Sequence, residues 1–106
     1  MKIFNKLVRD NIPDIIIKNG EIPETKILND EEYNKELNKK LLEEANEVVN
    51  AESLDDIKEE LADLYEVMLA KIKLLKSDIN EIEKMALKKR EKRGGFDNKI
   101  YLISTK

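Results

Sequence analysis

The chain has 106 residues, of which 41% are charged and 41% are hydrophobic, with a formal net charge of −3 and no Cys, His or Trp. This length suits one domain over residues 1–106. The missing residue types exclude disulfides, zinc–thiolate sites and histidine-based catalysis. Any metal must therefore be bound by oxygen, which favours hard cations such as Mg²⁺ or Mn²⁺.

The same composition bears on location and partners. No stretch approaches the roughly 18 apolar residues of a membrane helix, and residues 1–10 contain no apolar run typical of a signal peptide. We therefore expect a cytoplasmic protein with no membrane partner. The net negative charge argues against a nucleic-acid polymer as partner.

The distribution of Gly and Pro predicts a mostly helical chain. These residues occur near both ends and leave residues 24–93 uninterrupted, with Leu, Ile, Glu and Lys at helical spacing. A short first helix should follow Arg9, capped by Asp10, with Pro13 in its first turn and a stop at Asn19-Gly20. Residues 21–28 should form a connection, in which residues 25–28 can be extended.

Three longer helices should follow that connection. Their expected spans are residues 29–51, 53–76 and 77–93, with capping-box patterns at Ser53 and Asp78 and Gly94-Gly95 after the last. The short link at residues 52–53 requires the second and third helices to be antiparallel neighbours. Residues 99–104 are β-prone and would need a partner strand. The expected fold is all-α, a four-helix domain with short extended segments at its termini.

Helix geometry indicates which carboxylates point inward. At about 100° per residue, Glu44 lies within the apolar arc of the second helix, Glu47 roughly 60° away at its edge, and Glu43 further out. On the third helix, Glu60 lies between two apolar stripes and Asp63 heads the second stripe. Like charges facing inward repel strongly unless a cation neutralises them. We therefore predict a metal site held by Glu44, Glu47, Glu60 and Asp63, the alternative being solvated acids of a Glu-rich surface.

The second apolar stripe of the third helix consists of Val67, Ala70 and Leu74. A helix with two apolar stripes is packed on two sides, and one chain of short helices offers little cover for both. We therefore expect a homodimer, with the site near or across its interface.

Two acidic motifs carry a resemblance to a known family. Residues 43–47 read EExxE and residues 60–63 read ExxD, with twelve residues between them. This pair resembles the motifs of the MazG-like all-α nucleoside triphosphate pyrophosphohydrolase superfamily. Residues 5–13 and 92–96 are similar to the terminal segments of a small single-domain branch, described as house-cleaning or phosphoribosyl-ATP pyrophosphohydrolase-like proteins.

The resemblance implies a function and roles for particular residues. It implies magnesium-dependent cleavage of a nucleotide between its α- and β-phosphates, in a dimer or tetramer, with the four inward acids as metal ligands. Either Glu43 or Glu47 would orient the attacking water. Cationic candidates for the phosphates are Lys6, Arg9, Lys89, Lys92 and Arg93. The basic residues near Arg93 are also typical of an ordinary helix end, and a non-catalytic helical module that binds nucleotide or protein remains the alternative function.

Overall fold

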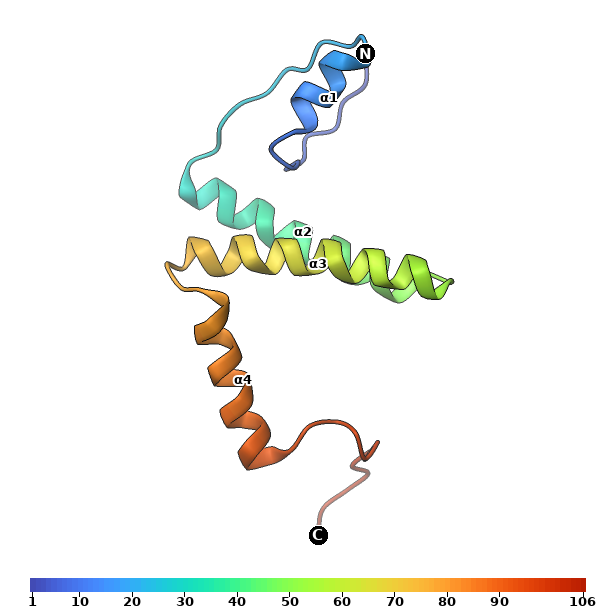
Figure 1. Cartoon of the computed structure of the whole chain (residues 1–106), viewed down its shortest axis with the longest axis vertical. Coiled ribbons are helices and arrows are strands. Elements are labelled where there is room, and N and C mark those ends of the chain that lie inside the picture. The colour runs from blue at the N-terminus through green and yellow to red at the C-terminus, as the bar shows by residue number, and fades with distance from the viewer.

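A computed structural model describes all 106 residues of the chain, and it contains four helices and no strand (Figure 1). The helices are α1 (Ile12–Lys18), α2 (Asp30–Asn50), α3 (Leu54–Leu74) and α4 (Ile79–Arg93). The all-α prediction is confirmed, and each helix lies close to its expected residues. None of the four helices has both the length and the apolar composition needed to cross a membrane.

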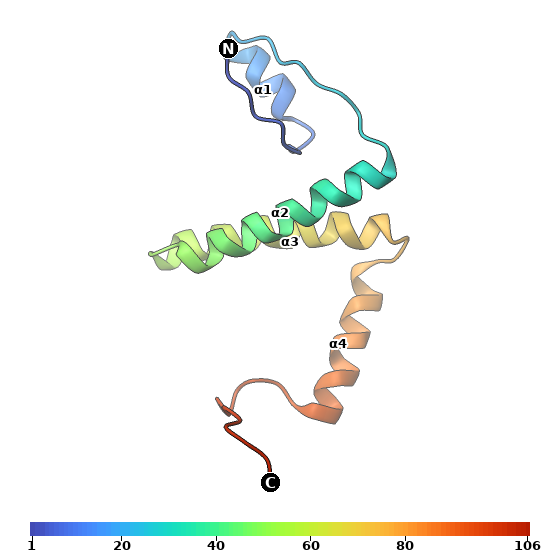
Figure 2. The ribbon, with the colours of Figure 1, turned by 180° about the vertical axis from the view of Figure 1, so that it is seen from behind.

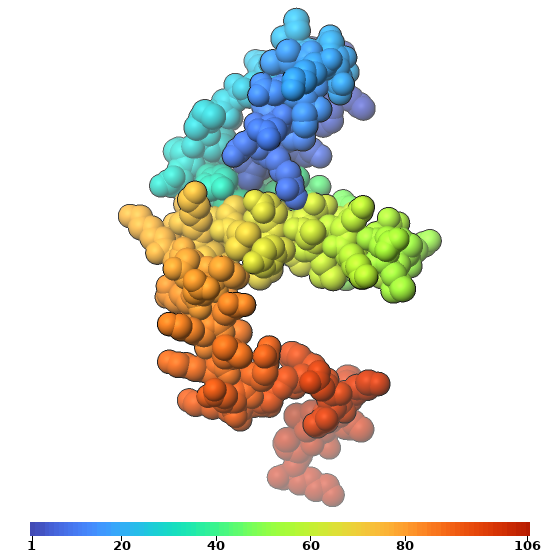
Figure 3. Space-filling view, viewed as in Figure 1, coloured from blue at the N-terminus to red at the C-terminus, as the bar shows by residue number.

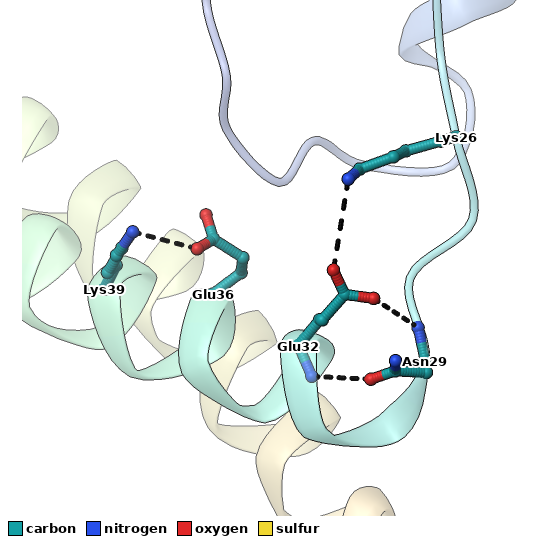
Figure 4. Close-up of polar contacts among 5 residues, drawn as sticks. All are labelled: Lys26, Asn29, Glu32, Glu36 and Lys39. Atoms are coloured by element: carbon teal, nitrogen blue, oxygen red, sulfur yellow. Dashed lines mark hydrogen bonds and ion pairs between the residues drawn. The ribbon is translucent and has the colours of Figure 1, made fainter.

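The start of α2 is fixed by a complete capping box. The Asn29 side chain accepts a hydrogen bond from the Glu32 backbone N–H at 2.9 Å, and the Glu32 carboxylate accepts one from the Asn29 N–H at 3.3 Å (Figure 4). Lys26 lies 3.9 Å from the same carboxylate, and Lys39 pairs with Glu36 at 3.0 Å one turn later. The two cap hydrogen bonds satisfy the backbone N–H groups of Asn29 and Glu32 and so set where α2 begins.

The other long helices have single caps in place of the expected boxes. At α3, the Ser53 hydroxyl accepts from the Asp56 N–H at 3.1 Å, and at α4 the Asp78 carboxylate accepts from the Glu81 N–H at 2.9 Å. At both helices the second hydrogen bond of a capping box, from the cap N–H to the side chain three residues later, is absent. At α4 the Glu81 side chain accepts from the Ser77 hydroxyl at 2.6 Å instead. At α3 the shorter Asp56 side chain makes no such bond. One-sided caps still satisfy an otherwise unpaired donor.

The first helix is also capped differently from the prediction. Asn11, and not Asp10, precedes α1, and its side chain makes no cap hydrogen bond. Pro13 occupies the first turn as expected, where its missing N–H costs nothing.

The helices are arranged as a central hairpin with two arms. The antiparallel pair α2 and α3, which we call the hairpin, is the one pair of helices with extensive packing. The segment containing α1 lies on one side of the hairpin and α4 lies on the other, as two opposite views show (Figures 1 and 2). The molecule measures 61 × 35 × 25 Å, and Leu37 and Ile72 are its only buried residues.

The C-terminal tail does not pair with either segment of the same chain that could supply a partner strand. Residues 99–106 form no strand and pair with neither residues 25–28 nor the N-terminal residues. The tail follows α4 on one side of the hairpin, whereas residues 25–28 and the N-terminal residues belong to the other side (Figure 1). This separation removes the pairing that a β-prone segment requires. A strand of a second chain is the other partner that the sequence allows.

The structure shows how far one chain covers the two apolar stripes of α3. Val67, Ala70 and Leu74 are half-buried. At about 100° per residue, Val67 and Leu74 lie between Asp63 and Lys71 around α3, and Ala70 lies about 20° from Asp63. Both Asp63 and Lys71 reach α2. The hairpin itself therefore covers this second stripe.

The main apolar stripe of α3 is covered only in part. Ile72 within it is 7% exposed, whereas Tyr65 and Leu75 are 49% and 65% exposed. The residues of this stripe are Ile57, Leu61, Leu64, Tyr65, Met68, Ile72 and Leu75.

Candidate metal centre

Three carboxylates from the two hairpin helices form one acidic cluster. Glu44 of α2 and Glu60 and Asp63 of α3 each place one carboxylate oxygen within 4.8 Å of the others, and all three residues are half-buried. The i, i+3 spacing places Glu60 and Asp63 on one side of α3, and the antiparallel packing brings Glu44 opposite them. We call these three residues the acidic cluster. Their convergence across the hairpin confirms that these carboxylates could hold a metal ion.

Burial and neighbouring negative charges raise the pKa of two carboxylates in the acidic cluster. Partial burial raises the pKa of Glu44, and the negative charges of Asp63, Glu47 and Glu43 raise it further, while Lys40 opposes the change. Desolvation likewise raises the pKa of Glu60, followed by the charges of Glu47, Asp63 and Glu44. Carboxylates that repel one another in this way favour a cation between them. An oxygen-only donor set suits a hard divalent ion.

One protein cation already contacts the cluster. The Arg9 guanidinium donates to the Asp63 carboxylate at 2.8 Å, and both side chains are substantially exposed. Arg9 belongs to the segment before α1, so this contact joins residues far apart in the chain. It places Arg9, which only the family resemblance singled out, at the edge of the acidic cluster.

The two remaining acids of EExxE lie beside the cluster. Glu43 and Glu47 are exposed and line a shallow, polar depression together with Glu60. Glu43 pairs with Lys40 at 3.7 Å, whereas Glu47 forms no salt bridge. Glu47 therefore lies at the rim of the acidic cluster and is not one of its three converging carboxylates.

Several polar residues near the hairpin were not predicted from the sequence. Asn50 and Asp56 line the same depression as Glu47 and Glu60. Their spacing was a usable signal, since Asn50 follows Glu47 by three residues and Asp56 precedes Glu60 by four. Lys71 is a further polar residue that the sequence did not single out. Its ammonium group donates to the side chains of Asn34 and Asn38, at 3.0 Å to the latter, and so links α3 to α2.

The other predicted phosphate ligands form no hydrogen bond or salt bridge with the acidic cluster. The Lys6 ammonium group lies 6.0 Å from the centre of the Phe4 ring, in the N-terminal segment. Lys89, Lys92 and Arg93 are exposed at the end of α4, on the opposite side of the hairpin from the segment that contains Arg9 (Figure 1). Of the five predicted cations, Arg9 alone forms a salt bridge with the acidic cluster.

The raised pKa values predict a pH-dependent stability. Because the folded pKa of Glu44 exceeds 4.5, its ordinary value, the native state binds more protons than the unfolded state as the pH rises above that value. The contribution of Glu44 to the free energy of unfolding is therefore full below pH 4.5 and falls as the pH rises through its folded pKa. In metal-free buffer, Glu44→Gln should melt higher than the wild type near pH 7, and the gap should narrow near pH 5. Thermal melts in EDTA measure this, with Glu66→Gln as the control for losing one negative charge. A gap that widens on acidification would contradict the prediction.

Comparison of the chain with models of protein families, with curated proteins and with solved structures finds no match.

Proposed function

We propose that this protein is a magnesium-dependent nucleotide pyrophosphohydrolase of the MazG-like type, which acts in the cytoplasm. It would convert a nucleoside triphosphate or a related nucleotide to a monophosphate and pyrophosphate. The observation that carries the proposal is the convergence of Glu44, Glu60 and Asp63 on one face of the hairpin, with the Arg9 guanidinium at its edge. Two acidic motifs on consecutive antiparallel helices supply these three carboxylates.

The acidic cluster suits Mg²⁺ or Mn²⁺, since all its donors are carboxylate oxygens. Glu44, Glu60 and Asp63 would bind the ion, and Glu47 at the rim is the nearest further acid of the motif. A bound divalent ion neutralises charge on phosphate oxygens and lowers the pKa of coordinated water. The raised pKa values of Glu44 and Glu60 fit this role, because a cation would relieve the repulsion that causes them.

The remaining steps use groups of the chain itself. Arg9 can exchange its contact with Asp63 for a substrate phosphate, to which a guanidinium donates two hydrogen bonds. Glu47, which has no salt bridge, would accept a proton from the water that attacks the α-phosphorus. The bond from that phosphorus to the bridging oxygen breaks, and pyrophosphate leaves with the electron pair. Glu43, paired with Lys40, would help to orient Glu47 and the water.

A nucleotide-panel screen with product identification tests the proposed function. The panel includes the common ribo- and deoxyribonucleoside triphosphates, diphosphates, nucleotides with damaged bases, and phosphoribosyl-ATP. We expect pyrophosphate and a monophosphate from at least one triphosphate, only when Mg²⁺ or Mn²⁺ is present. A folded protein that is inert toward the whole panel would overturn the proposal, and release of single phosphates would assign a different reaction.

Magnesium should also stabilise the folded protein in the absence of substrate. At a concentration about 100 times its dissociation constant, an ion bound only to the native state adds about 2.7 kcal/mol, which corresponds to a melting temperature higher by roughly 10 °C for a domain of this size. Melts with Mg²⁺ and with EDTA at equal ionic strength measure the shift. An unchanged melting temperature would favour the non-catalytic helical module over the enzyme.

A further inference from the structure

The start of the chain forms an arm that a single polar contact ties to the hairpin. We call residues 1–20 the N-terminal arm, which contains α1 and has no buried residue. Among the hydrogen bonds and salt bridges of the chain, only the contact of Arg9 with Asp63 joins the N-terminal arm to the hairpin. In the space-filling view the arm extends away from the hairpin and meets it at one end (Figure 3). Arg9 is therefore the polar anchor of the whole arm.

The segment that follows the N-terminal arm allows it to move. Gly20 adopts φ 89°, which ends α1 in a conformation that favours glycine. Residues 22–28 lie outside any helix and form no backbone hydrogen bond. The next fixed point of the backbone is the capping box at Asn29. Because few backbone contacts hold this segment, its rearrangement costs little free energy.

Two cations of the chain lie beside the carboxylates of the site, and they differ in how firmly they are held. Lys40 of α2 pairs with Glu43 at 3.7 Å, its side chain is only 18% exposed, and its charge favours the ionised form of Glu44. The Arg9 and Asp63 side chains, by contrast, are 61% and 44% exposed. An ion pair that is this exposed is weak and is screened by salt. Arg9 is thus the exchangeable counter-ion of the acidic cluster, and Lys40 is the permanent one.

Arg9 and a divalent ion compete for the same carboxylate. Asp63 accepts the hydrogen bond from Arg9, and it is also one of the three carboxylates that could hold a metal ion. A guanidinium that contacts a metal-binding carboxylate is repelled by the two positive charges of the ion. Three carboxylates together hold a divalent ion more firmly than one exposed carboxylate holds an arginine. The ion therefore displaces Arg9, and the unordered linker lets the arm follow.

We propose that the N-terminal arm is a metal-sensitive latch. In the metal-free protein Arg9 holds the arm against the acidic cluster, and binding of a divalent cation releases Arg9 and residues 1–20 with it. The latch rests on the proposed function, because it takes the acidic cluster as the metal site and Arg9 as a ligand of substrate phosphate. It adds an order of events, since Arg9 becomes available to a phosphate only after the cation is bound.

Titration of the full chain with Mg²⁺ alone, followed by calorimetry, tests the competition. Arg9→Gln should bind Mg²⁺ about threefold to tenfold more tightly than the wild type, because the competing cation is gone. Lys18→Gln removes a positive charge from an exposed position of the same arm and should bind Mg²⁺ like the wild type. An arginine that instead supports Asp63 as a metal ligand would make Arg9→Gln bind Mg²⁺ more weakly. Affinity equal to or weaker than that of the wild type would overturn the latch.

Distances between spin labels test the release of the arm. The chain has no cysteine, so nitroxides at Ile17→Cys on α1 and Asp55→Cys on α3 report how the arm lies relative to the hairpin. Both positions are exposed, and labelled chains are diluted into unlabelled protein so that only pairs within one chain are measured. Mg²⁺ should lengthen and broaden the distance distribution relative to NaCl at equal ionic strength. With Arg9→Gln the distribution should be broad in both solutions.

The combined results separate the latch from the proposed function. If calorimetry shows Mg²⁺ binding while the wild-type distances stay unchanged, the latch is overturned and the metal site stands. A wild-type distribution that is already broad in EDTA also overturns the latch alone. Absence of Mg²⁺ binding to the wild type would overturn both the latch and the metal site of the proposed enzyme.

Discussion

Asp63→Asn should abolish pyrophosphate release, with a loss of at least about 100-fold in kcat under saturating Mg²⁺. The change removes one of the three carboxylates that converge across the hairpin, and it removes the acid to which Arg9 donates. The side chain keeps its size, so packing is preserved. The exposed Arg9 contact contributes at most about 1 kcal/mol to stability, so loss of the fold would not explain loss of activity.

The control for this variant lies on the same helix. Asp55→Asn makes the same chemical change in the first turn of α3, outside the acidic cluster, and it should retain wild-type activity. The Mg²⁺-induced rise in melting temperature should likewise be lost in Asp63→Asn and kept in Asp55→Asn. Wild-type turnover by folded Asp63→Asn would show that the acidic cluster is not the catalytic site.

Leu37→Ala should have the largest effect on stability of any single truncation. Leu37 is 2% exposed and is one of only two buried residues, the other being Ile72. Truncation of a buried leucine to alanine removes apolar contacts and leaves a cavity, at a cost of about 2–5 kcal/mol. Because so few side chains are fully buried, the neighbouring residues cannot compensate. Urea denaturation at one fixed protein concentration measures the change in the free energy of unfolding.

The matched control for the core variant is Ile22→Ala. Ile22 is 96% exposed, so its truncation should change the free energy of unfolding by no more than about 0.5 kcal/mol. A Leu37→Ala midpoint that equals that of Ile22→Ala would mean that the centre of the hairpin does not hold the fold together.

The helices could be predicted from the sequence because their determinants are local. Asn29 with Glu32, Ser53 and Asp78 lie within three residues of the N–H groups that they cap, and Gly94 adopts φ 81° directly after α4. The unpaired tail could not be predicted in the same way. Its β-propensity is a local property, but strand pairing depends on where α4 carries the tail.

The candidate site was predictable to the extent that it depends on helix geometry. The angular position of Glu44 within the apolar arc and the i, i+3 spacing of Glu60 and Asp63 predicted their convergence across the hairpin. The position of Glu47 at the edge of that arc agrees with its exposure at the rim. The contact of Arg9 with Asp63 spans 54 positions in sequence, and no periodicity specifies such a contact.

The compact link between α2 and α3 has a consequence for the order of folding. The two long helices are joined by residues 51–53 alone, so the hairpin closes a very short loop, with little entropic cost and at a rate independent of protein concentration. Refolding of the hairpin should thus show a fast phase whose rate dilution of the protein leaves unchanged.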